Sequence, residues 1–169
     1  MAHLLVSDTS VLIDLERGNL LQATFKLATP LAAPDVLYDR ELRPTNGALL
    51  RTLGLQVLAL DPNGTALAQR YKARSPALSV PDAFALALAK TGTHVLVCGD
   101  RALKDLALSE SVECHGLFWI LDRLLDASLV SPQHLHTALA TIADHPRCRL
   151  PRHLVAAALA RWLATGGRD

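Results

Sequence analysis

The sequence lacks the features of several large protein classes. It has 169 residues and no apolar run of the roughly 18 to 20 residues that a membrane-spanning helix needs. Its start, MAHLLVSD, reaches a charge after only a few apolar residues and lacks the basic beginning of a signal peptide. We therefore expect a soluble, cytoplasmic protein that does not bind a membrane.

The sequence also has few cysteines and a net charge close to zero. The three cysteines, Cys98, Cys114 and Cys148, include no CxxC pair, which is typical of free thiols in a reducing compartment. This pattern argues against a disulfide framework and against a zinc site. The formal net charge is +1, which argues against a protein whose main role is to coat nucleic acid.

Apolar residues make up half of the chain, enough for the core of one domain of ordinary size. Short apolar runs predict strands over 4–6, 55–60, 94–97 and 112–114, and residues 29–34, with two prolines, predict a short extended piece. Helical spacing and caps predict helices over 10–21 (interrupted at Gly18), 20–28, 35–42, 46–53, 65–74, 79–92, 102–108, 117–125, 133–144 and 152–164. Alternation of strands and helices is typical of the α/β class with a parallel sheet.

The last third of the chain differs from the rest. Beyond residue 115 every predicted element is a helix, and neither a Pro/Gly linker nor an internal repeat separates it from the preceding part. We expect residues 1–115 to form an α/β domain and residues 116–169 to form a helical extension packed on or beside it, within one structural domain.

Acidic residues occur where predicted strands end or helices begin. Asp8 follows the first strand, Asp100 follows HVLVCG, Asp82 lies in the first turn of the helix capped by Ser79, and Asp39 or Glu41 lies in the helix over 35–42. Open parallel sheets place their ligand sites at the carboxyl ends of the strands. Converging carboxylates repel one another unless a cation is present, and Mg²⁺ and Mn²⁺ prefer oxygen ligands. The pattern therefore predicts a metal site.

Longer segments carry a resemblance to a known family. DTSVLIDLERG, APDVLYDREL and SVPDAFALALAKTGTHVLVCGD, followed by DRALKDLA, occur in this order over about residues 4–107. They resemble the motifs of PIN-domain ribonucleases, in the style of the VapC-like toxins of toxin–antitoxin pairs. The resemblance implies a three-layer α/β/α fold with a central parallel sheet, here with a helical C-terminal extension. It also implies an endoribonuclease that depends on Mg²⁺ or Mn²⁺.

The resemblance assigns four acids as metal ligands and catalytic residues. Asp8, Asp82 and Asp100 match the family motifs directly. Glu41 is favoured as the remaining acid because Glu-Leu is the usual pair there, and Asp39 is kept as a supporting neighbour that could serve instead.

Two further residues are assigned supporting roles by the resemblance. Ser10 matches the small hydroxyl residue that accompanies the first Asp. Cys98 stands where the family usually has Thr or Ser before Gly-Asp, and a thiol is a poorer hydrogen-bond donor than a hydroxyl. We expect this departure to affect the rate more than the fold. The sequence identifies no substrate-binding residue.

The resemblance implies an RNA substrate, a role as the toxin of a type II toxin–antitoxin pair, an antitoxin protein as partner, and a homodimer. A different hypothesis is a PIN-fold binding or assembly module that keeps its acids but acts through the helical tail. A receiver-type phosphoacceptor is disfavoured, because it needs an acidic pair after the first strand, where this chain has Asp8 alone.

Overall fold

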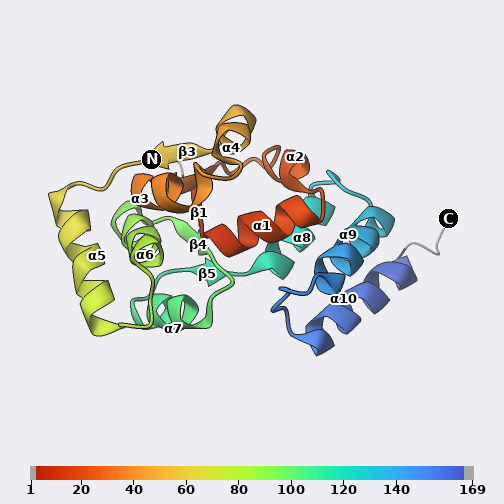
Figure 1. Ribbon diagram of the computed structural model, residues 1–169. Coiled ribbons are helices and arrows are strands. Elements are labelled where there is room, and N and C mark those ends of the chain that lie inside the picture. Colours follow the sequence, from red (N-terminus) through yellow and green to blue (C-terminus); the bar gives the residue numbers. More distant parts are fainter. Residues whose placement is uncertain (1–2, 166–169) are drawn as a thin grey trace. The chain divides into compact units, whose positions relative to one another are not determined.

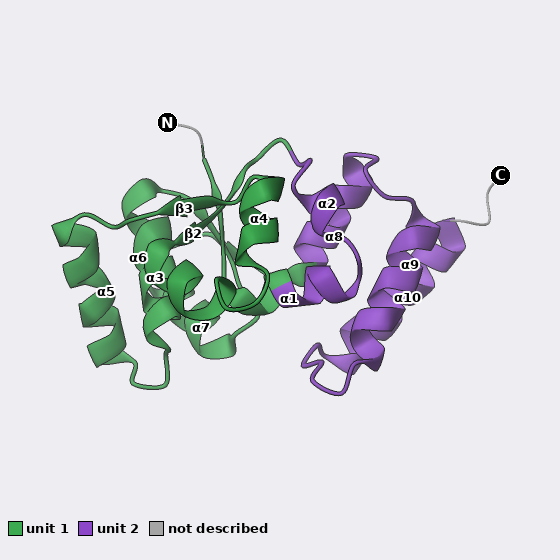
Figure 2. Ribbon diagram, turned by 45° about the horizontal axis from the view of Figure 1, so that its top comes forward, with its two compact units in different colours: residues 1–12, 28–117 green, residues 13–27, 118–169 purple. Residues whose placement is uncertain are grey.

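The computed structural model describes residues 3–165 (Figure 1). By the density of internal contacts it divides into two compact units, coloured separately in Figure 2. Unit 1 takes in the described chain up to Leu12 and Ala28–Leu117, and unit 2 takes in Ile13–Leu27 and the described chain from Phe118. The second unit thus contains a segment from near the N-terminus in addition to the C-terminal helices.

Unit 1 is built on a sheet of five parallel strands. They are β1 (Leu5–Ser7), β2 (Leu31–Pro34), β3 (Gln56–Leu58), β4 (Val95–Val97) and β5 (Cys114–His115), in the order β3-β2-β1-β4-β5. β1 lies at the centre, with Leu5 paired to Leu31 on one side and to Val95 on the other. The proline-containing extended piece is therefore a full member of the sheet.

Helices cover both faces of this sheet, which confirms the predicted three-layer α/β/α class. They are α1 (Thr9–Arg17, whose last residues belong to unit 2), α3 (Asp35–Leu37), a π-helical turn η1 (Tyr38–Leu42), α4 (Gly47–Leu53), α5 (Pro62–Arg74), α6 (Val80–Gly92) and α7 (Arg101–Ser109). α6 packs against β1, β2 and β4, and α5 packs on α6. The order of the strands reverses direction between β3 and β4. Right-handed crossovers therefore put the helices that connect β1 to β3 on one face and those that connect β3 to β5 on the other.

Helix boundaries in unit 1 follow local capping chemistry. Ser79 caps α6 by accepting a hydrogen bond from the N–H of Asp82, as its sequence position predicts. Asp61 caps α5 in the same way, so that helix begins at Pro62, earlier than expected from its apolar spacing. Gly54 ends α4 with a φ of 118°, a left-handed conformation that favours glycine.

The core of unit 1 lies between β1 and α6. Leu5 and Val6 of the central strand are buried, as are all residues of α6 from Ala83 to Ala89 except Phe84. A central strand of a parallel sheet is buried on both faces. This explains why the residues that form β1 belong to a continuous apolar run in the sequence. This rigid centre places the residue after β1, Asp8, at a defined position.

Unit 2 is helical. It contains the end of α1, α2 (Leu21–Thr24), α8 (Leu117–Asp126, which begins on the last residue of unit 1), α9 (Pro132–Asp144) and α10 (Arg152–Thr165). α9 packs against α10, and Trp162 of α10 is buried. A Cβ on Gly18 would lie 2.8 Å from Cδ1 of Ile142, so the segment after α1 approaches α9 closely. Over residues 3–165, no helix is long and apolar enough to cross a membrane.

Candidate metal centre

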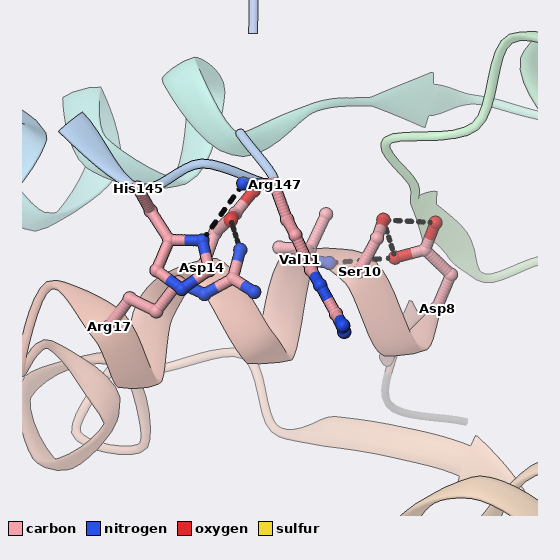
Figure 3. Close-up of polar contacts among 7 residues, drawn as sticks. All are labelled: Asp8, Ser10, Val11, Asp14, Arg17, His145 and Arg147. Atoms are coloured by element: carbon pink, nitrogen blue, oxygen red, sulfur yellow. Dashed lines mark hydrogen bonds and ion pairs between the residues drawn. The ribbon is translucent and has the colours of Figure 1, made fainter. Parts of the chain in front are cut away.

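Asp8 is held rigidly at the carboxyl end of β1. Its N–H donates to the carbonyl of Val97 at 2.9 Å, which fixes its backbone against β4. Its side chain is almost fully buried, and the hydroxyl of Ser10 donates to the carboxylate, with Oγ 2.9 Å from each oxygen (Figure 3). Ser10, assigned a supporting role from the sequence, therefore contacts Asp8 directly.

Backbone amides complete the surroundings of the Asp8 carboxylate. The N–H of Val11, in the first turn of α1, donates to Oδ1 at 2.9 Å, and the N–H of Gly99 donates to Oδ2 at 2.8 Å. Burial raises the pKa of Asp8, while these N–H groups and the Ser10 hydroxyl act in the opposite direction. A nearby cation would also favour the ionised form of the Asp8 carboxylate, which these hydrogen bonds already stabilise.

Gly99 is required at its position by the close approach of Ser10. A Cβ on Gly99 would lie 2.6 Å from Oγ of Ser10, closer than real contacts allow. The Gly-Asp pair after β4 is visible in the sequence, but the reason for its glycine is this contact, which joins two segments far apart in the chain.

Glu41 lies on the π-helical turn η1 that follows β2 and α3. The wider turn is closed by a hydrogen bond from the N–H of Arg43 to the carbonyl of Tyr38 at 2.8 Å. Single π turns are rare and occur frequently at functional sites. The hydroxyl of Thr9 donates to Oε2 of Glu41. Sequence reasoning missed Thr9 as a site residue, although Thr9 directly follows Asp8 in the chain.

Asp39 lies on the same turn but has different surroundings. Its side chain is about half exposed (51 %) and forms an ion pair with Arg43 at 2.8 Å between Oδ1 and Nη2. Its charge is not among those that act on Asp82, whereas that of Glu41 is. On this turn the charge of Glu41 thus acts on Asp82, whereas Asp39 pairs with Arg43.

The charges of the other three predicted acids act on the carboxylate of Asp82. It lies in the first turn of α6, partly buried. Burial, together with repulsion from the carboxylates of Asp8, Glu41 and Asp100, raises its pKa from 3.8 to about 6, against an opposing hydrogen bond with Ser79. The charges of three acids from separate segments thus act on Asp82, and these four residues are called the carboxylate cluster: Asp8, Glu41, Asp82 and Asp100.

Asp100 also has a structural role. It is exposed and caps α7, with Oδ2 accepting a hydrogen bond from the N–H of Leu103 at 2.9 Å. The cap explains why α7 begins immediately after β4, and it holds the carboxylate at the carboxyl end of the sheet.

The thiol of Cys98 contacts that of Cys114. The two sulfur atoms are 3.0 Å apart, and both cysteines, like Cys148, are free thiols. The hydrogen bond between the two thiols, together with burial, raises the pKa of Cys98. No hydrogen bond between the Cys98 thiol and Asp100 occurs in the described residues.

The donor chemistry of the carboxylate cluster fits a hard divalent cation, because all four side chains offer oxygen and their charges repel one another. In residues 3–165, however, no three His, Cys, Asp or Glu side chains are placed to ligate one ion. Three of the carboxylates instead accept hydrogen bonds from groups of the protein.

The comparisons with known proteins identify the family. A family model described as PIN domain matches residues 4–163, and the chain belongs to this family. The family consists in general of nucleases, which typically use divalent metals. No curated protein matches the chain significantly.

Among solved structures, the chain is similar to the crystal structure of PAE2754 from Pyrobaculum aerophilum. The TM-score is 0.52 at 22 % sequence identity, and the match covers 75 % of this chain and 99 % of that one. At this identity the likeness concerns the fold.

Proposed function

We propose that this chain is an endoribonuclease that depends on Mg²⁺ or Mn²⁺ and hydrolyses phosphodiester bonds in RNA. The observation that supports it most is the raised pKa of Asp82, about 6, caused by burial and by the charges of Asp8, Glu41 and Asp100. A protein that buries and crowds carboxylates in this way loses stability unless a cation joins them. Membership of a family of nucleases supports the same reading.

Each acid has a distinct task in this proposal. Asp8 would be the fixed ligand, because three donors, the Ser10 hydroxyl and the N–H groups of Val11 and Gly99, orient its carboxylate. Glu41 would be positioned by Thr9, and Asp100 by its place at the start of α7. Asp82, with a pKa of about 6, would be mostly ionised at pH 7 and would lose that charge in mild acid.

A bound Mg²⁺ or Mn²⁺ would supply Lewis acidity, which makes water a better nucleophile and offsets the charge that develops on a phosphate. The chain itself contributes the orientation of the four carboxylates. It also contributes a low-dielectric wall around Asp8, which strengthens the attraction between that carboxylate and a cation.

The test is cleavage of single-stranded RNA by the purified protein with Mg²⁺ or Mn²⁺, compared with Asp8→Asn. We expect the variant to lose at least about 100-fold in rate, equivalent to about 2.7 kcal/mol of barrier. Asp39→Asn is the matched control, because Asp39 lies on the same turn as Glu41 but pairs with Arg43. It should keep most of the activity, whereas Glu41→Gln should lose it.

The proposal fails if wild type and Asp8→Asn cleave equally, or if the wild type cleaves no RNA over a broad range of metals and pH. Loss of activity in Asp39→Asn with retention in Glu41→Gln would exchange the roles of these two acids.

We further propose that the protein is the toxin of a type II toxin–antitoxin pair, with a homodimer as its own assembly and an antitoxin protein as partner. The resemblance of its motifs to VapC-like toxins supports this role. Growth arrest on expression, relieved by co-expression of a small DNA-binding protein from the adjacent gene, would support it. Normal growth with an active nuclease would exclude it, and gel filtration tests the dimer.

The second candidate function is a binding or assembly module. It is favoured by the hydrogen bonds that occupy Asp8, Glu41 and Asp100 within the protein, and by the exposed Leu154 and Leu163 on α10. Calorimetry distinguishes the two functions. Binding of Mn²⁺ that disappears in Asp8→Asn supports the nuclease, and absence of metal binding with a tight protein partner supports the module.

A further inference from the structure

The two cysteines at the β4–β5 edge are placed for a reaction with each other. Cys98 follows directly after β4, and Cys114 begins β5, the neighbouring parallel strand. The N–H of Cys98 donates to the carbonyl of His115 at 2.9 Å, so the backbones are paired at this point. The sulfur atoms lie 3.0 Å apart. In the sequence the same residues are separated by 16 positions and form no recognisable motif.

We propose that Cys98 and Cys114 form a reversible modification site, which peroxides oxidise to an intramolecular disulfide. The reaction balances as two thiols and one hydrogen peroxide giving one disulfide and two waters. The two electrons come from the sulfur atoms, and both thiol protons leave in the water. The sulfur atoms approach by about 1 Å to reach the bond length of about 2 Å. Because Cys114 is in register with Leu96, two residues before Cys98, the backbone at Cys98 moves as the bond forms.

The exposure of the two thiols sets the order of the steps. Cys114 is partly exposed, whereas the side chain of Cys98 is only 3 % exposed. Peroxide therefore reaches Cys114 first and converts it to a sulfenic acid with release of one water. The Cys98 sulfur then attacks the oxidised sulfur, forms the S–S bond and releases the second water. A buried neighbour that resolves the sulfenic acid also protects it from further oxidation.

The position of this pair connects it to the carboxylate cluster. Cys98 is followed by Gly99, whose N–H donates to Oδ2 of Asp8 at 2.8 Å, and then by Asp100. Drawing Cys98 toward Cys114 shifts the backbone that carries this amide, so oxidation changes the environment of Asp8. A resulting change in the rate of RNA cleavage rests on the proposed function, but formation of the disulfide does not.

The experiment uses the full chain carrying Cys148→Ser, which removes the remaining thiol and any crosslink through it. The protein is treated with hydrogen peroxide from substoichiometric amounts to a small excess, alkylated and digested with trypsin. Cleavage after Arg101 and Lys104 separates the two cysteines onto peptides 91–101 and 105–123. We expect these two peptides to appear joined, with the intact protein lighter by two hydrogen atoms and with both free thiols recovered by dithiothreitol.

Cys114→Ser is the matched variant, because its side chain is partly exposed and the change is small. It should form no crosslink, and its buried Cys98 should react with peroxide at least about tenfold more slowly than wild-type Cys114. Amide NMR provides a further readout, since the Gly99 resonance should shift on oxidation of the Cys148→Ser protein and return on reduction.

The proposal is overturned if peroxide yields sulfinic or sulfonic acid on Cys114 without the joined peptide, or if the crosslink forms only between chains. Detection of the joined peptide in a protein that cleaves no RNA would uphold the modification site and reject the proposed nuclease. An active nuclease that yields no joined peptide would uphold the proposed nuclease and reject the modification site.

Discussion

Replacing Asp82 by Asn tests the electrostatic crowding of the carboxylate cluster in metal-free protein. The pKa of Asp82 is about 6 in the folded chain, against an ordinary value of 3.8. Between these pH values the folded state holds a proton that the unfolded chain has released, so the free energy of unfolding decreases as pH rises from about 4 to about 6. Above pH 6 the full cost of the ionised side chain is present.

The magnitude follows from this difference. At about 1.4 kcal/mol per pH unit, a pKa raised from 3.8 to about 6 corresponds to about 3 kcal/mol. Asp82 is only partly buried, and screening by solvent reduces the value to about 1–2 kcal/mol. Asn also loses the favourable interaction of a carboxylate with the start of α6, about 0.5 kcal/mol. We therefore expect Asp82→Asn to be about 1 kcal/mol more stable than wild type at pH 7.

The assay is thermal unfolding in EDTA at pH 4 and pH 7. The variant should unfold about 2–4 °C above wild type at pH 7 and show no gain at pH 4, where Asp82 is protonated in wild type. Asp105→Asn is the control, since Asp105 is largely exposed and lies 3.9 Å from Arg101, and it should change stability by less than about 0.5 kcal/mol. A variant that is less stable than wild type at pH 7, or equally stabilised at both pH values, would refute the reasoning.

Binding of Mn²⁺ should make wild type more stable than Asp82→Asn, the opposite of the order expected without metal. At a Mn²⁺ concentration about 100 times its Kd, wild type should gain about 2.7 kcal/mol. Asp82→Asn has lost one oxygen ligand and its charge, so it should gain less and become the less stable protein. Equal stabilisation of both proteins would remove Asp82 from the metal site while leaving the metal-free prediction intact.

Three further changes test individual contacts. Thr9→Val removes the hydroxyl that donates to Glu41 at nearly constant volume, and it should lower the affinity for Mn²⁺ by about 10-fold or more in calorimetry while the unfolding temperature changes little. Gly99→Ala forces a Cβ to within 2.6 Å of Oγ of Ser10. It should lower the free energy of unfolding in urea by about 1–3 kcal/mol. An unchanged urea midpoint would contradict the close approach of Gly99 and Ser10. Tyr71→Phe removes the hydrogen bond to Glu110 (3.1 Å) and should lower the free energy of unfolding by about 1 kcal/mol. It should also abolish the phenolate absorbance step near pH 12 that the raised pKa of Tyr71 predicts.

Local patterns in the sequence were enough to predict most elements of the fold. β1 and β4 are short strands that end directly before Asp8 and Cys98, and the cap of α6 at Ser79 is confirmed. These features depend on residues within a few positions of one another, where capping chemistry and apolar spacing act directly. The PIN-domain family, inferred from the order of the motifs, is also confirmed.

Elements that depend on partners elsewhere in the chain were harder to predict. The proline-containing piece becomes β2 only because β1 and β3 pair with it on either side. The helix expected over 35–42 is instead α3 followed by the π turn η1, and no local signal distinguishes a π turn from an α-helix. The expected helix over 20–28 shortens to α2, Leu21–Thr24.

What the sequence alone determined is where the four proposed metal ligands lie along the chain: they are acids at strand ends and helix starts, in an order that resembles one family. Tertiary structure alone decided how they meet. It brought Glu41 rather than Asp39 to Asp82, joined Thr9 to Glu41, and placed Cys98 against Cys114. The physical reason is that burial, repulsion between carboxylates and thiol contact depend on distances between segments far apart in the chain, which periodicity along the sequence does not encode.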